Sequence, residues 1–124
     1  MKRRCLAVIF VLCLVLAACG GNKTKSIIYV IPDFSSVLSK SDLVTSSDSD
    51  TSIDQRYTNG TKEKYDKVVE ICMSSGFDHD LRNVEFRDDF WRYDAYDADE
   101  NYYIEVFWED NEITIFLNTV EKTE

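Results

Sequence analysis

The feature that most restricts the fold of this chain is a strict alternation of apolar and polar residues near its C-terminus. A two-residue turn at Asp110-Asn111 would place three successive apolar pairs on one face of a hairpin. These pairs are Trp108 with Ile113, Val106 with Ile115, and Ile104 with Leu117. A slip of one residue would move each of these side chains to the opposite face. Residues 104–117 therefore predict an antiparallel hairpin, with the small penalty of Glu109 opposite Glu112 beside its turn.

A third alternating stretch, from about Val84 to Tyr96, predicts one more strand before this hairpin. A four-residue loop after it would set Arg92 opposite Glu105, which makes a cross-strand ion pair. Any even loop length extends the apolar face of the hairpin onto this strand. That face then carries Trp91, Tyr93, Ile104, Val106, Trp108, Ile113, Ile115 and Leu117.

Residues 61–75 show the apolar period of a helix rather than that of a strand. One stripe with spacings of three and four residues contains Tyr65, Val68, Val69, Cys72 and Met73. Thr61 suits the N-cap position, and Gly76 stands where a left-handed residue ends a helix. The expected fold is an α+β domain over residues 61–124, with one amphipathic helix packed on a three- to four-stranded antiparallel sheet, a meander.

The second face of the predicted sheet is unusually aromatic for a surface that meets water. It carries Phe86, Phe90, Tyr103, Phe107 and Phe116, among Arg92, Glu105 and Thr114. A sheet with one solvated face normally alternates more cleanly, so we expect a cover over this face. The first candidate is the chain's own 27–31 and 34–38 segments, and the others are a partner protein, a second copy or a ligand. If nothing in the chain covers this aromatic face, it indicates a binding site.

Residues 19–60 are predicted to be mostly a polar tether. The run Ile27–Ile31 before Pro32 is compatible with one strand. The Ser- and Asp-rich stretch that follows has too few apolar residues to order itself, and we interpret it as a linker. A flexible tether over residues 20–60 would have a root-mean-square reach of roughly 35 Å.

The N-terminus has the pattern of a secretory signal. Lys2, Arg3 and Arg4 precede 14 uncharged, mainly apolar residues, Cys5–Ala18. A membrane-spanning helix needs roughly 20 apolar residues, whereas a basic start and a short apolar run ending in small residues are typical of a cleaved leader. We therefore expect residues 1–18 to be a signal peptide.

The sequence Leu16-Ala17-Ala18-Cys19 resembles the lipobox of bacterial lipoproteins. The resemblance covers only the leader and Cys19, and it implies that Cys19 becomes the diacylglyceryl-modified first residue of the mature chain. Two acyl chains hold a protein on a membrane firmly, whereas one holds it reversibly. Gly20, rather than aspartate, after this cysteine implies the outer membrane in a Gram-negative host, and a Gram-positive host would keep the protein on its plasma membrane.

Cleavage at this point would also set the cysteine count and the charge of the mature chain. Cys5 and Cys13 would leave with the leader and lipid would modify Cys19, so that Cys72 remains as the single thiol, without an internal disulfide partner. Its place in the apolar stripe predicts a buried core thiol. The net charge would change from −9 to about −12, which excludes nucleic acid as a partner.

Several chemical motifs fail on closer reading. His79 is the sole histidine, whereas zinc sites use several His or Cys ligands, so we expect a loop histidine. Ser74-Ser75-Gly76 lacks the full nucleophile motif and suits a helix end. Residues 97–101 begin like a calcium loop, but lack its later glycine and glutamate and predict an acidic turn. The neighbours Asp88 and Asp89 would point to opposite faces of a strand and could not flank one bond.

The hypothesis at this point is a membrane-anchored surface lipoprotein on the extracytoplasmic side of a bacterial membrane. It would act as a non-enzymatic protein-interaction module, without cofactor or metal, whose aromatic face and acidic rim hold a protein partner at the envelope. Two alternatives stay open. One is a cell-wall glycan-binding module that stacks sugars on its rings, and the other is a small hydrolase whose site the sequence does not reveal.

Overall fold

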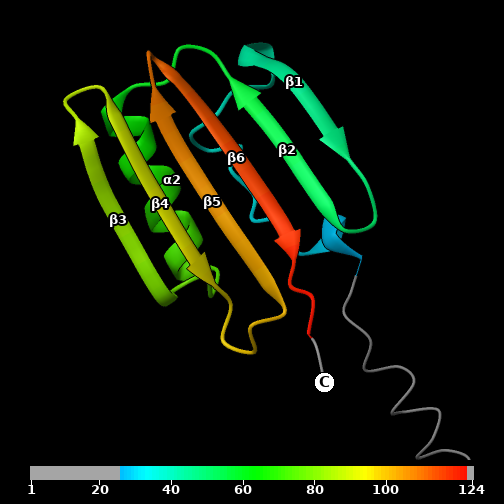
Figure 1. Cartoon of the computed structure of the whole chain (residues 1–124). Helices are drawn as coiled ribbons and strands as arrows, with labels where there is room; N and C mark the ends of the chain where they lie inside the picture. The colour runs from blue at the N-terminus through cyan, green and yellow to red at the C-terminus, as the bar shows by residue number, and fades with distance from the viewer. Residues whose placement is uncertain (1–25, 123–124) are drawn as a thin grey trace, which may run out of the picture.

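The chain folds as an α+β structure in which one helix lies on one face of a six-stranded antiparallel sheet. A computed structural model describes residues 26–122, and Figure 1 shows its arrangement. The elements are η1 (Ile27–Tyr29), η2 (Lys40–Asp42), β1 (Leu43–Asp48), β2 (Ser52–Tyr57), α2 (Lys62–Ser74), β3 (His79–Arg87), β4 (Phe90–Tyr96), β5 (Tyr102–Glu109) and β6 (Glu112–Thr119).

The strand order β1-β2-β6-β5-β4-β3 explains the path of the chain. After the β1–β2 hairpin, α2 carries the chain across the sheet to its far edge. From there β3, β4, β5 and β6 form a meander that returns to pair with β2, so the sheet is open, with β1 and β3 as its edge strands (Figure 1). The described part of the chain thus contains a sheet with two more strands than the upper limit expected.

The predicted hairpin and helix are confirmed. Trp108 pairs with Ile113, Val106 with Ile115, Ile104 with Leu117, and Glu109 with Glu112. The Thr61 side chain accepts a hydrogen bond from the Lys64 backbone N–H, 3.1 Å away, as an N-cap should. Gly76 follows the helix with a φ of 99°. Met73 departs from the prediction, because its side chain is 44% exposed rather than packed in the core.

The single strand expected over 84–96 is wrong, because the chain reverses at Asp88-Asp89 and makes two strands, β3 and β4. The register to β5 also differs by two residues, so that Arg92 lies opposite Phe107 and Asp94 lies opposite Glu105. The expected ion pair nevertheless forms on the diagonal, with Arg92 Nη2 2.9 Å from a Glu105 carboxylate oxygen. Long side chains on one face reach diagonal neighbours, which is why the pair survives the shift.

The interpretation of residues 33–60 as linker is also wrong. The Ser- and Asp-rich stretch forms β1 and β2, and the expected strand at 27–31 is instead the short 3-10 helix η1. Strand β2 is ordered by its neighbour rather than by its own composition, since six of its residues pair with β6 and it buries Ile53 and Tyr57. Strand β1 is an edge strand, with one partly buried residue and five exposed ones.

One hydrophobic core fills the space between the sheet and its single cover. The cover consists of α2 and the segment 27–38, which lie on the same side of the sheet (Figure 1). Ile27, Phe34 and Leu38 belong to the same buried cluster as Tyr65 and Val68 of the helix. The expectation that the segment 27–38 covers the aromatic second face is therefore wrong. A single helix is too narrow to cover six strands, and η1 at the start of this segment packs on β2 and β6 instead.

Candidate functional site

The face of the sheet away from α2, the outer face, is the candidate site because no described segment covers it (Figure 1). Strand alternation places all five predicted aromatic residues there. Phe86 is 56% exposed, and Phe90, Tyr103, Phe107 and Phe116 are half-buried by one another and by neighbouring side chains. The structure thus brings the predicted residues together on one open surface.

Four phenylalanine rings form a continuous row across the outer face, here called the phenylalanine row. The ring centroids of Phe86 and Phe90 lie 4.8 Å apart, those of Phe90 and Phe107 6.5 Å, and those of Phe107 and Phe116 5.9 Å. The row runs from edge strand β3 through β4 and β5 to β6. Such contacts preorganise an apolar surface, because each ring is held by the next before any partner arrives.

Two arginines lie over this row and fix its rings. The guanidinium carbon of Arg87 lies 5.3 Å from the ring centroid of Phe90, and that of Arg92 lies 5.3 Å from that of Phe107. These cation–π contacts place positive charge beside apolar rings while the arginines keep their own carboxylate partners. Arg87 is a site residue that the sequence analysis missed. It lies directly before the Asp88-Asp89 turn, which the sequence pattern does not distinguish from the middle of a strand.

Arg92 is held by a buried network beside the row. Its Nε lies 3.1 Å from Asp94 Oδ2, and the other Asp94 oxygen accepts a hydrogen bond of 3.0 Å from Arg82 Nε. The Asp94 side chain is only 4% exposed, so two guanidinium groups compensate one buried carboxylate. The Tyr103 hydroxyl accepts a hydrogen bond of 3.3 Å from Arg92. Burial raises the pKa of the Tyr103 hydroxyl, which favours its neutral form.

One end of the outer face is acidic. The turns β3–β4 and β5–β6 bring Asp88, Asp89, Glu109, Asp110 and Glu112 to this end, here called the acidic rim. Arg87 pairs there with Asp89 at 2.7 Å and with Glu109 at 2.8 Å, and Arg56 pairs with Glu112 at 3.5 Å. The hydrogen bond from Arg87 lowers the pKa of the Asp89 carboxyl and keeps it ionised. Five carboxylates against two arginines leave this end negative.

Two adjoining hollows lie where the phenylalanine row meets the acidic rim. One of about 370 Å³ is lined by Arg56, Phe90, Phe107, Glu109, Asp110, Glu112, Thr114 and Phe116. The other, of about 360 Å³, shares Arg56, Thr114 and Phe116 and adds Thr45 and Asp54. Both combine ring faces with carboxylates. The arrangement can hold an apolar side chain and a cationic group side by side.

The residues tested for chemistry do not converge on a site. His79 begins β3 rather than lying in a loop, and its Nε2 lies 3.4 Å from Glu100 on the surface. No group of three metal-ligating side chains occurs within residues 26–122. Cys72 is fully buried, as predicted, and desolvation raises the pKa of its thiol to about 12.

The remaining candidate motifs have structural roles. Asp88 and Asp89 form the β3–β4 turn instead of lying within a strand. In the 97–101 segment, Asp97 Oδ1 accepts hydrogen bonds from the backbone N–H groups of Asn101 and Tyr102, at 2.8 and 2.9 Å, which confirms an acidic turn. Ser74 and Ser75 lie at the end of α2, as expected.

Cys19 and the leader lie outside the described residues. Within residues 26–122, no helix has the length and apolar character needed to cross a bilayer. No family model matches the chain, and neither a curated protein nor a solved structure matches it.

Proposed function

We propose that this protein is a bacterial surface lipoprotein, anchored by lipid at Cys19, that binds a protein partner on the outer face of its sheet. The lipobox-like sequence Leu16–Cys19 supports the anchor. The observation that carries the binding role is the open phenylalanine row. A soluble domain rarely leaves contiguous aromatic surface exposed without a use for it, because such surface promotes aggregation.

The partner expected from this surface presents apolar side chains flanked by Lys or Arg. Apolar groups would pack on the rings of Phe90, Phe107 and Phe116, where aromatic residues commonly dominate interface energetics. The acidic rim beside them favours a cationic flank, since it carries more carboxylates than arginines. The module is non-enzymatic in this proposal, because the outer face supplies contact surface and charge rather than a nucleophile and base.

Photo-crosslinking in cells of the native host tests this role. A photoreactive amino acid at Thr114, inside the first hollow, should capture a partner, whereas one at Ser36 on the opposite side should not. The Phe107→Ala variant should reduce capture at Thr114 at least about tenfold, as expected for the loss of an interface hot spot. The Met73→Ala variant changes an exposed apolar residue on the helix and should leave capture unchanged.

Equal capture from both sides, or capture that survives Phe107→Ala in a folded chain, would contradict the proposal. Raised salt should slow association if the acidic rim guides a cationic partner. Circular dichroism of each variant separates a lost interface from a lost fold.

A cell-wall glycan is the second candidate ligand, and one observation favours it. The Tyr96 and Tyr103 rings lie 4.7 Å apart on the outer face, where they could stack on a sugar. Both tryptophans face the helix side instead, and Trp108 is buried there. Co-sedimentation with purified peptidoglycan that is lost in Tyr103→Ala and retained in Phe107→Ala would favour the glycan over the protein partner.

A further inference from the structure

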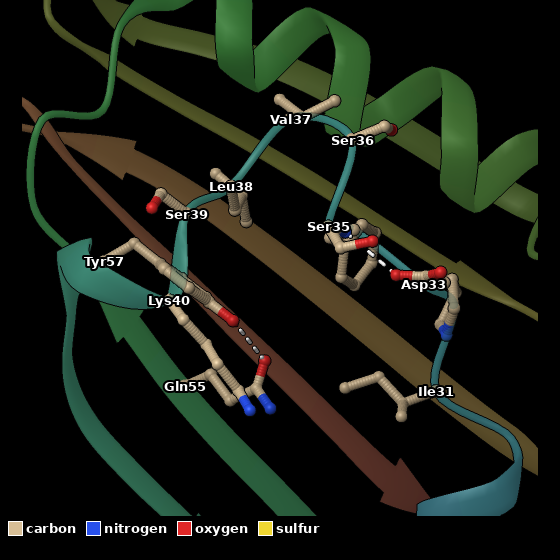
Figure 2. Close-up of a pocket in the computed structure, with 12 residues that line it drawn as sticks. Ile31, Asp33, Ser35, Ser36, Val37, Leu38, Ser39, Lys40, Gln55 and Tyr57 are labelled. Atoms are coloured by element: carbon tan, nitrogen blue, oxygen red, sulfur yellow. Dashed lines mark hydrogen bonds between the residues drawn. The ribbon is translucent and has the colours of Figure 1, made fainter.

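A third hollow, of about 910 Å³, lies on the opposite side of the sheet from the outer face. It is formed by the segment 31–40 where this segment passes over β2, and Figure 2 shows its lining side chains. Phe34, Leu38 and Tyr57 are each at most 9% exposed and give it an apolar base. Ser35, Ser36 and Ser39 add small polar groups to its wall. The hollow is therefore amphipathic.

Gln55 breaks the apolar pattern of the helix-side face at this hollow. It lies between Ile53 and Tyr57 on that face, and both of these neighbours are buried. The Tyr57 hydroxyl donates a hydrogen bond of 3.1 Å to Gln55 Oε1 (Figure 2). This contact satisfies the carbonyl end of the amide and leaves its NH₂ group for another acceptor. A polar residue at a position whose neighbours on the same face are apolar and buried often has a functional role.

Lys40 supplies a positive charge at the same hollow. Every other basic side chain within residues 26–122 forms an ion pair or a hydrogen bond, whereas Lys40 forms neither with any residue in this range. Figure 2 shows the side chains of Lys40 and Gln55 directed toward the same side of the hollow. Two nitrogen donors without an acceptor thus lie beside an apolar wall.

We propose that this hollow binds a small monocarboxylic acid with an apolar or aromatic body. Its carboxylate would accept hydrogen bonds from Lys40 Nζ and Gln55 Nε2, and its body would lie against Phe34 and Leu38. Asp33 in the same wall limits the negative charge that a ligand can carry. Its carboxylate accepts a hydrogen bond of 2.9 Å from the Ser35 backbone N–H, and hydrogen bonds from Ser35 lower its pKa. A fixed negative charge there disfavours a second anionic group on the ligand.

A titration with benzoate, followed through the amide NMR spectrum of the ¹⁵N-labelled full chain in nonionic detergent micelles, tests this site. Benzoate should shift the signals of residues 31–40 and 55–57 with a millimolar dissociation constant, about 1–10 mM for so small a ligand. Benzamide, its neutral analogue of the same shape, should bind about tenfold more weakly, because it lacks the charge that Lys40 recognises.

Paired variants separate the site from general electrostatics. Lys40→Met should weaken benzoate binding about five- to tenfold, whereas Lys40→Arg should retain it. Lys67→Met removes a charge from the exposed face of α2 and should change nothing. Both lysines are exposed, so the fold should persist in each variant, and the amide spectrum verifies it. Equal binding of benzamide, unchanged binding by Lys40→Met, or shifts elsewhere would overturn the proposal, as would no shift at about 20 mM benzoate.

Discussion

Buried ionisable side chains dominate the chemistry of single residues on the helix side of the sheet. Tyr65, Tyr93 and Cys72 are fully buried, and desolvation raises the pKa of each of them. The two tyrosine hydroxyls both donate hydrogen bonds: Tyr65 donates one of 2.7 Å to Asn83 Oδ1, and Tyr93 donates one to the Phe77 carbonyl. The core therefore requires all three groups in their protonated form.

This requirement predicts that stability falls in alkaline solution. The Cys72 thiol has an ordinary pKa of 9.0, and its pKa in the folded chain is about 12. Between these values the unfolded chain binds fewer protons than the folded one, so the free energy of unfolding decreases as the pH rises. The contribution of the Cys72 thiol to the free energy of unfolding is fully present below pH 9 and is lost as the pH rises toward 12. Each such group contributes a slope of up to about 1.4 kcal/mol per pH unit.

Urea unfolding at a series of pH values measures this slope. Unfolding midpoints should be flat from neutral pH to about 9 and decline above it. The Cys72→Ala variant should be less stable throughout but decline less between pH 9 and 10, before the tyrosines of the unfolded chain ionise. Identical pH slopes for the two chains would show that Cys72 is not the titrating group.

At the residue scale, the sequence predicts burial correctly where it depends only on which face of a strand or helix a residue occupies. Cys72 was placed in the core by its helical spacing, and Phe107 and Phe116 were placed on the outer face by alternation from Ile104 and Ile115. Gln55 could not be assigned a role in this way. Its side chain lines a hollow only because the 31–40 segment packs above it, and no local sequence pattern predicts that contact.

At the scale of elements, the junction between β2 and α2 depends on the absence of a side chain at Gly60. Its backbone N–H donates a hydrogen bond of 2.7 Å to Asn111 O, and its carbonyl accepts one of 2.9 Å from Trp108 Nε1. A Cβ atom at this position would lie 2.8 Å from Ile113 Cγ1 and 3.0 Å from the Ile113 backbone nitrogen. The start of the helix is thus held directly against the β5–β6 hairpin.

We expect Gly60→Ala to destabilise the fold by about 1–3 kcal/mol, the usual cost of overpacking a tight contact. The clash involves the β6 backbone, which cannot move aside as a flexible side chain could. Chemical denaturation of the variant against the parent chain measures the loss. Asn59→Gly next to it removes a surface hydrogen bond to Asp42 but tolerates the positive φ of 55° at this position, so it is the matched control and should cost less. A Gly60→Ala chain as stable as the parent would refute the close packing of this junction.

The sequence predicts the elements that have a clear apolar periodicity, and it does not predict the elements that are ordered only by pairing with their neighbours. Helix α2 and the β5–β6 hairpin carry their own apolar faces, so the sequence pattern found them. Strand β1 has five exposed residues and no apolar period to detect. The sequence predicts one strand in place of β3 and β4, because their turn contains two aspartates and no glycine and does not interrupt the alternation. Pairing with a preformed sheet edge, rather than local preference, fixes such strands.

For the whole molecule, the position of the buried residue Ile27 limits the distance between the domain and its proposed anchor. Ile27 is fully buried, and η1 packs on β2 and β6, so residue 27 is already part of the folded domain. Six residues, 20–25, separate Cys19 from Ser26. Even a fully extended chain of this length spans only about 25 Å. This is shorter than the roughly 35 Å reach expected for a tether that extended to residue 60.

If Cys19 is the anchor, so short a connection would also orient the domain relative to the membrane. Figure 1 shows η1 beside the end of β6, with the β5–β6 turn at the opposite end of the sheet. Strand β6 has eight residues, which separates these two ends by about 27 Å. On η1, Ile28 is 53% exposed and Tyr29 is 81% exposed, so apolar and aromatic side chains lie at the end of the sheet nearest the proposed anchor. Such residues are favoured at a membrane interface.

Energy transfer to labelled lipid in proteoliposomes measures this orientation on the acylated chain. A donor dye at Tyr29→Cys should transfer strongly to headgroup acceptors, and the same dye at Asp88→Cys in the β3–β4 turn should transfer weakly, because η1 and this turn lie at opposite ends of the sheet. Cys72 is buried and should not compete for the dye in the folded chain. Equal transfer from both sites, in protein whose Cys19 acylation is verified by mass spectrometry, would mean that the domain tumbles freely on its anchor. Unmodified Cys19 in protein from the native host would instead remove the anchor itself, and with it the reason for the outer face to meet an envelope partner.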